Sequence, residues 1–90
     1  MALPLGKVIC TFGALVAFAG AIEDQPDTFL SRHANDDWGE VDEHDRKAND
    51  YALAHGLRVL SAYTLKSGQK IWIITEADRS TTTILLPEEY

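Results

Sequence analysis

Carboxylates are the residues of this chain that could do chemistry, and they are concentrated in residues 23–50. Ten Asp and Glu lie in this acidic segment against three Arg and Lys, a formal charge of −7, whereas the whole 90-residue chain carries −6. Carboxylates at this density can bind a cation, exchange protons with a substrate or attract a basic surface. The acids are Glu23, Asp24, Asp27, Asp36, Asp37, Glu40, Asp42, Glu43, Asp45 and Asp50, and the cations are Arg32, Arg46 and Lys47.

The histidines suggest a metal site by their spacing, but the chain around them argues against one. His33, His44 and His55 are eleven residues apart, a separation that returns to nearly the same face of a continuous helix. Gly39 interrupts the chain between the first two, and the last two would lie about 16 Å apart on one helix. Residues 36–50 do not match the ligand positions of an EF-hand loop. We therefore predict no metal and no cofactor, and we expect the histidines at the surface or at helix ends.

Nucleophilic catalysis has little support in the sequence. None of Ser61, Ser67 and Ser80 lies in a Gly-x-Ser-x-Gly turn. Cys10, the only cysteine, falls in a predicted buried strand without the electropositive setting that activates a thiol. A single cysteine also excludes an intramolecular disulfide and fits the cytoplasm. We therefore predict that the chain is not an enzyme.

A polar triplet, Asp78-Arg79-Ser80, closes a predicted hairpin. The simplest interpretation is a turn in which Asp78 caps backbone N–H groups and Arg79 pairs with Glu76 or a helix carboxylate. A partner-binding hairpin tip is the alternative. If the chain were a small enzyme, a weaker alternative, Asp78 and Glu76 would be its carboxylates.

The first elements that could position these residues lie in an apolar stretch. Residues 7–11 are β-branched and apolar, which predicts a buried strand. Residues 12–19 predict a short helix with Leu15 and Phe18 on one side. The uncharged run 8–22 also resembles the apolar core of a secretory signal, but it is too short to span a membrane as a helix. We therefore favour a strand followed by a helix.

Two further helices are predicted in the acidic segment. Residues 26–33 start with a proline, which a first helical turn accepts, and would bury Phe29 and Leu30. Residues 43–55 follow Asp42 as the N-cap and precede a glycine that ends the helix. The residues expected on one face of this third helix are Ala48, Tyr51, Ala52 and His55.

The last third of the chain predicts strands. Residues 57–64, 70–76 and 81–86 are rich in Val, Ile, Thr, Trp and Tyr, and short polar turns separate them. We therefore expect a three-stranded antiparallel meander, joined by the strand at 7–11, with two or three helices on one face. This is an α+β fold, and residues 1–90 suffice for a single domain.

Four motifs carry a resemblance to a known family. They are Asp37-Trp38-Gly39, Ser61-Ala62-Tyr63, Trp72-Ile73-Ile74-Thr75-Glu76-Ala77-Asp78-Arg79-Ser80 with Thr82, and Leu85-Leu86-Pro87-Glu88-Glu89-Tyr90. With these motifs the chain resembles short uncharacterised bacterial proteins carried on plasmids, prophages and other mobile elements, some of them labelled "type I restriction endonuclease subunit M". The label does not fit the residues, because a methyltransferase subunit needs a glycine-rich cofactor loop and an Asn/Asp-Pro-Pro-aromatic motif, and this chain has neither. The chain also departs from the family at Thr11-Phe12-Gly13-Ala14, where a Thr-Pro-Gly-Ala sequence is expected.

The charge pattern and the resemblance together predict a small acidic protein-binding module. Its partner would be a basic, nucleic-acid-handling defence protein, inhibited in the manner of an anti-CRISPR or anti-restriction protein, in some cases by imitating DNA. A structural or regulatory accessory subunit, of the restriction-modification or antitoxin type, is the alternative. The net negative charge argues against direct nucleic-acid binding, and no membrane association is expected. A homodimer remains open.

The candidate partner-binding residues surround one turn and one hairpin. They are Asp36, Asp37, Trp38, Glu40, Glu43, Asp78 and Arg79. Among the aromatic residues, Trp38, Trp72 and Tyr63 could anchor a partner or pack in the core. For Trp72, in an Ile-rich strand, the core is the favoured interpretation.

Overall fold

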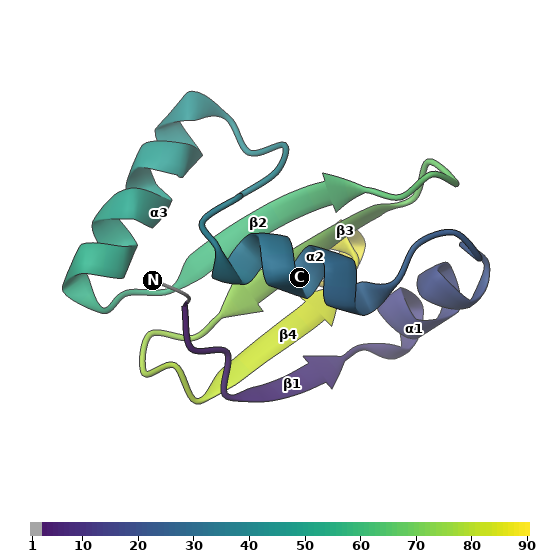
Figure 1. Cartoon of the computed structure of the whole chain (residues 1–90), viewed down its shortest axis with the longest axis horizontal. Helices are drawn as coiled ribbons and strands as arrows, with labels where there is room; N and C mark the ends of the chain where they lie inside the picture. The colour runs from purple at the N-terminus through teal and green to yellow at the C-terminus, as the bar shows by residue number, and fades with distance from the viewer. Residues whose placement is uncertain (1–2) are drawn as a thin grey trace.

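The computed structural model describes residues 3–90 as a four-stranded sheet with three α-helices (Figure 1). The elements follow in the order β1 (Lys7–Cys10), α1 (Phe12–Ala19), α2 (Pro26–Ala34), α3 (Glu43–His55), β2 (Val59–Thr64), β3 (Lys70–Thr75), β4 (Thr81–Leu85) and a 3₁₀ turn at Pro87–Glu89. The predicted α+β class, the C-terminal meander and the N-terminal strand are confirmed. Among these residues, no helix is long and apolar enough to cross a membrane.

The sheet has the strand order β1-β4-β3-β2 and is mixed. The meander strands β2, β3 and β4 are antiparallel neighbours, as expected. β1 pairs in parallel with β4, with Lys7 opposite Thr81, so the expectation of an antiparallel sheet is wrong for this strand. Parallel neighbours require a long crossover connection, and between β1 and β4 it consists of the three helices followed by β2 and β3.

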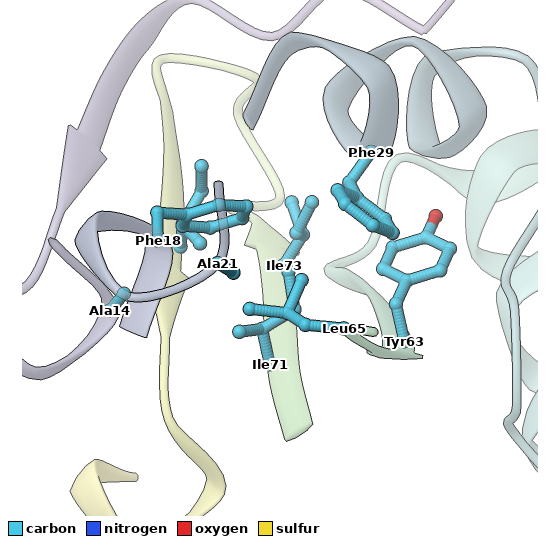
Figure 2. Packing of buried hydrophobic residues seen from close by; sticks show 9 residues of the cluster. Ala14, Phe18, Ala21, Phe29, Tyr63, Leu65, Ile71 and Ile73 are labelled. Atoms are coloured by element: carbon cyan, nitrogen blue, oxygen red, sulfur yellow. The ribbon is translucent and has the colours of Figure 1, made fainter. Parts of the chain in front are cut away.

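The main core lies between the sheet and the helices α1 and α2, which cover the same face (Figures 1 and 2). Phe18 and Phe29 extend from these helices toward Tyr63, Ile71 and Ile73 on the sheet. The aromatic rings pack at tilted angles, with centroids 6.0 Å apart for Phe18 and Phe29 and 5.3 Å apart for Phe29 and Tyr63. Such pairs add a directional component to the burial of apolar area.

The helical phase of α1 differs from the prediction. Ala14 and Phe18, one helical turn apart, are buried against the sheet, whereas Leu15 is 59% exposed. The side chain of Thr11 caps this helix by accepting a hydrogen bond from the backbone N–H of Ala14, 3.1 Å away. Leu15 was predicted on the same side as Phe18, but the buried face of α1 instead joins Phe18 to Ala14, four residues before it.

Helix α3 lies beside β2, and a polar side chain connects the two. The side-chain amide of Asn49 donates to the carbonyl of Leu60 at 2.8 Å and accepts from its N–H at 3.1 Å. Ala52 packs with Val59 in a second, smaller core. Asp42 caps the helix and Gly56 ends it with a left-handed conformation, as predicted. Of the face proposed from the sequence, only Ala52 is buried, while Ala48, Tyr51 and His55 are exposed.

The two edges of the sheet differ. The segment around Gly39 pairs with the outer side of β2, where Glu40 N–H donates to Ala62 O at 2.7 Å and Ala62 N–H donates to Trp38 O at 3.0 Å. β1, at the opposite edge, is exposed along its whole length, with Val8 44% and Ile9 42% accessible. The prediction that β1 is a buried strand is therefore wrong, because an edge strand has a neighbour on one side only.

Candidate functional site

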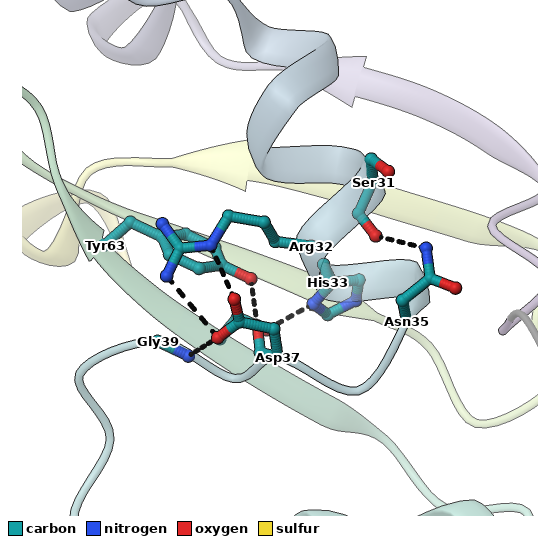
Figure 3. A network of polar contacts seen from close by, with 8 residues as sticks. Ser31, Arg32, His33, Asn35, Asp37, Gly39 and Tyr63 are labelled. Carbon is teal, nitrogen blue, oxygen red and sulfur yellow. Dashed lines mark hydrogen bonds and ion pairs between the residues drawn. The ribbon is translucent and has the colours of Figure 1, made fainter.

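The acidic turn after α2 is tied into the fold by Asp37 (Figure 3). Its carboxylate accepts from Arg32 Nε at 2.7 Å and from the N–H of Gly39 at 3.2 Å. These hydrogen bonds, that of Arg32 first, lower the pKa of Asp37 below its usual value. The Arg32 guanidinium also lies 4.7 Å from the centre of the Tyr63 ring. Asp37, a predicted partner-binding residue, therefore has a structural role in shaping the turn.

The other acidic candidates differ in whether their carboxylates are already paired within the fold. Glu43 is paired with Arg46 one turn along α3. Glu40 is exposed and accepts a hydrogen bond from the hydroxyl of Thr64 at 2.9 Å. Asp36 is exposed and adopts a positive φ of 67°, which Asp tolerates better than most residues. Only part of the predicted acidic surface is therefore available to a partner without breaking an ion pair.

A groove of about 310 Å³ lies between the start of α3 and the sheet. Trp72, Ala62 and Leu60 give it an apolar floor, while Glu40 and Asp45 are among the carboxylates that line it. Trp72 lies on the opposite face of β3 from the core residues Ile71 and Ile73 and is only half-buried, so its expected core position is wrong. The complete lining is Glu40, Val41, Asp42, Asp45, Leu60, Ala62, Tyr63, Lys70 and Trp72.

The groove combines an aromatic ring with an excess of negative charge. Three carboxylates and one ammonium group line it, a formal charge of −2. A carboxylate pairs with Arg or Lys, and an indole face attracts the same cations. The groove can therefore accept a cationic side chain, and an anionic ligand would be repelled.

Trp38 and Tyr63 are core residues. Trp38 is 3% exposed, and its indole N–H donates to Asp50 at 3.2 Å. Tyr63 is 2% exposed, its hydroxyl donates to the carbonyl of Asp37 at 2.6 Å, and its burial raises its pKa to about 12. The prediction that Trp38 binds a partner is therefore wrong for the folded chain, because a buried indole offers no surface for contact.

The Asp78-Arg79-Ser80 turn is a structural connection between the hairpin and α3. Asp78 accepts hydrogen bonds from the N–H and hydroxyl of Ser80, at 3.0 and 2.6 Å, as predicted for a capped turn. Arg79 binds carbonyls and not the expected carboxylates: its guanidinium donates to Leu57 O at 2.7 Å and to Ala52 O at 3.3 Å. Ala52 O also accepts from the N–H of Leu57 at 2.9 Å, so Arg79 adds a side-chain contact to the backbone hydrogen bonds that end α3. Its guanidinium is thus committed to the fold, which argues against Arg79 as a partner contact.

A series of buried, hydrogen-bonded polar side chains, which the sequence did not predict, crosses the core. His33 is fully buried, with Nδ1 2.5 Å from the hydroxyl of Ser61 and Nε2 2.8 Å from that of Thr75. Thr75 contacts Thr82 at 2.7 Å, and Thr82 donates to the carbonyl of Leu5 at 2.7 Å. His33 lies in the last turn of α2, one of the two positions expected for the histidines, but it is buried and not at the surface. Its spacing of four residues after Phe29 was the available signal for a shared buried face.

The carbonyl of Leu5, at one end of this series of side chains, determines the direction of every hydrogen bond in the series. A carbonyl only accepts, so Thr82 uses its proton on Leu5 and must accept from Thr75. Thr75 therefore accepts from His33 Nε2–H, which leaves Nδ1 to accept from Ser61. The imidazole is neutral, because burial and the nearby Arg79 lower its pKa to about 4. Ser61 and His33 form a hydrogen-bonded pair with no exposed surface, so a substrate has no access to it in the folded chain.

Two further exposed groups of side chains carry atoms that could bind a metal or react. Asp42, His44 and Asp45 present ligand atoms within 4.8 Å of one another at the start of α3, all of them exposed. This arrangement could hold a metal ion weakly, although Asp42 is also engaged as the helix cap. Cys10 is exposed, against expectation, but partial burial and then the charge of Glu89 raise its pKa, so the reactive thiolate is disfavoured.

Comparison with known proteins gave no matching family model, no matching curated protein and no matching solved structure.

Proposed function

We propose that this chain is a protein-binding module that captures a cationic side chain of its partner in the groove beside α3. The observation that carries the proposal is the position of Trp72 among the carboxylates of Glu40, Asp42 and Asp45. The ring supplies an apolar and cation-attracting surface, and the acids supply charge and hydrogen-bond acceptors. A cation between them would satisfy both at once.

The remaining acidity supports this mode of binding. The whole chain carries −6, so a basic partner is attracted before any contact is made. The groove then determines where the partner docks, because it joins negative charge to a partly exposed aromatic floor. Asp37 and Glu43 are paired with Arg32 and Arg46, which interrupts the row of free carboxylates that an imitation of DNA would need. Docking of individual cationic side chains is therefore favoured over mimicry of DNA.

The partner proposed is a basic, nucleic-acid-handling protein, which the module inhibits by occupying its cationic surface. Proteins of this kind expose Arg and Lys for phosphate contacts, and these are the groups that the groove fits. The resemblance to mobile-element proteins supports a host defence protein as the target and the cytoplasm as the compartment. An accessory subunit of a larger assembly is the second candidate, and the exposed apolar edge at β1 favours it.

The groove can be tested by removing its aromatic floor. A labelled Gly-Arg-Gly-Arg-Gly peptide is the probe, and binding is followed by the chemical shift of the Trp72 indole N–H at low salt. We expect Trp72→Ala to weaken binding of the peptide about tenfold, since a partly desolvated cation–aromatic contact contributes about 1–2 kcal/mol. For this variant, fluorescence anisotropy of the labelled peptide replaces the indole signal.

Charge is tested separately with two matched double variants. Glu40→Gln with Asp45→Asn removes two charges inside the groove, and Asp36→Asn with Glu88→Gln removes two charges outside it. We expect only the first pair to weaken peptide binding strongly and to reduce its dependence on salt. Equal weakening by both pairs would show that net charge, and not the groove, attracts the peptide. Affinity capture with wild type and with each pair then relates the groove to the natural partner.

A further inference from the structure

The strand β1 leaves one edge of the sheet without a partner among residues 3–90 (Figure 1). Lys7 N–H donates to Ser80 O at 2.9 Å, and Thr11 N–H donates to Ile84 O at 3.0 Å. In a parallel ladder, alternate residues of a strand bond to the same neighbour. The N–H and carbonyl groups of Val8 and Cys10 therefore point away from β4, toward the free side of the strand.

The side chains of this edge are unusual for a surface strand. Val8 and Ile9 are 44% and 42% exposed, and successive residues of a strand point to opposite faces, so β1 is apolar on both faces. Proteins usually protect such an edge with charges, proline or a covering segment. The opposite edge of this sheet has that protection, since the segment at Gly39 pairs with β2. At β1 Lys7, at the start of the strand, is the single charge, and the rest of the strand is apolar and open to a binding partner.

We propose that the occupant is a second copy of this chain, with the two β1 strands pairing antiparallel about a two-fold axis. The axis stands perpendicular to the sheet, so both copies keep their helices on the same side. Residues directly opposite each other must then point to the same face. A register with Ile9 opposite the partner's Ile9 meets this condition, and it places Val8 opposite the partner's Cys10. The outward backbone groups of Val8 and Cys10 form the hydrogen-bonded pairs of the new ladder.

Charge complementarity supports this register. Placing Ile9 opposite its own copy puts Lys7 opposite the partner's Thr11. The hydroxyl of Thr11 donates to the carboxylate of Glu89 at 2.6 Å, so that carboxylate lies beside the position reached by Lys7. The two-fold axis creates this contact twice. The neighbouring register, with Val8 opposite Val8, would place the Lys7 ammonium against the partner's Ile9 and lose the contact.

The register is tested by disulfide trapping in a Cys10→Ser background. Ile9→Cys would place two thiols on strands whose Cα atoms are about 4.5 Å apart, within disulfide range. Val8→Cys, the matched control, would lie about 8–9 Å from its own copy and outside that range. We expect the first variant to form a covalent dimer with oxidised glutathione and the second to remain largely monomeric. No covalent dimer from Ile9→Cys, or a better yield from Val8→Cys, would overturn the proposed register.

The dimer itself is tested by sedimentation equilibrium over a concentration series that reaches the millimolar range. We expect wild type to associate and Ile9→Lys, which places two ammonium groups opposite each other on the axis, to weaken dimerisation at least tenfold. Tyr51→Lys on α3 has a similarly exposed starting side chain and should leave dimerisation unchanged. Circular dichroism checks that each variant is folded. A wild type that stays monomeric throughout, or two lysine variants with equal effects, would refute self-association through β1.

Discussion

Lowering the pH from about 6.5 to about 4 is expected to destabilise the fold by about 3 kcal/mol through His33 alone. The folded chain holds this imidazole neutral, with a pKa of about 4, because it is buried and lies near the positive charge of Arg79. The unfolded chain binds a proton near the ordinary value of 6.5, so protons favour unfolding throughout this range. The stability is fully present above about pH 6.5 and is lost progressively as the pH falls toward 4.

The measurement is urea unfolding followed by circular dichroism at several pH values between 4 and 7. His33→Gln is the matched variant, because an amide can donate and accept hydrogen bonds but does not titrate. The variant is less stable at pH 7, yet its stability should change much less between pH 6.5 and 5. Below pH 5, carboxylates with lowered pKa values such as Asp37 contribute to both proteins and cancel in the difference. Identical pH profiles for the two proteins would contradict the role given to His33.

Replacing Gly39 with alanine is expected to reduce the free energy of unfolding by about 3 kcal/mol. The new Cβ would lie 2.0 Å from the carbonyl oxygen of Ala62, and the residue would keep a φ of +74° that side chains rarely adopt. The left-handed conformation costs about 1–2 kcal/mol, and displacing the segment weakens two backbone hydrogen bonds worth about 1 kcal/mol each. Because Glu40 and Val41 follow directly and line the groove, peptide binding should fall as well.

Gly56→Ala is the control for this prediction. Gly56 has a similar φ of +66°, but a Cβ there would meet nothing within 4 Å. The free energy of unfolding of Gly56→Ala should therefore fall only by the cost of the left-handed conformation, about 1 kcal/mol. Urea unfolding of the two variants at pH 7 separates the close approach of two backbone segments from the cost of the left-handed conformation. Equal losses would mean that the segment at Gly39 can move away from β2 without consequence.

Local signals in the sequence predicted the elements well. Asp42 and Gly56 bound α3 because a side-chain cap and a left-handed glycine depend only on neighbouring residues. The β-branched runs likewise predicted β2, β3 and β4. The direction of β1 relative to β4 could not be predicted from local signals, because it depends on the path of the helices and strands between them. Its exposure followed from its place at the edge of the sheet.

The candidate site was predicted only in part. Glu40 was expected from charge density and lies in the groove, whereas Trp72 reaches the same groove because β3 pairs with β2 and places it opposite Ala62. That pairing joins distant segments and has no local signature. The role of Arg79 was missed for a similar reason, since two of its carbonyl partners, Ala52 in α3 and Leu57 just after it, lie more than twenty residues earlier.

The pairing of Lys7 with Thr81 has a consequence for biosynthesis. The two strands lie far apart in the sequence, so β1 has no neighbour in the sheet until β4 has been synthesised. The hydrogen bond from Thr82 to Leu5 is subject to the same delay. Contacts between such distant segments slow folding, and apolar segments stay accessible while they wait. Pairing of β1 with β4 is therefore a late step in folding, and association through the exposed β1 segment competes with it until then.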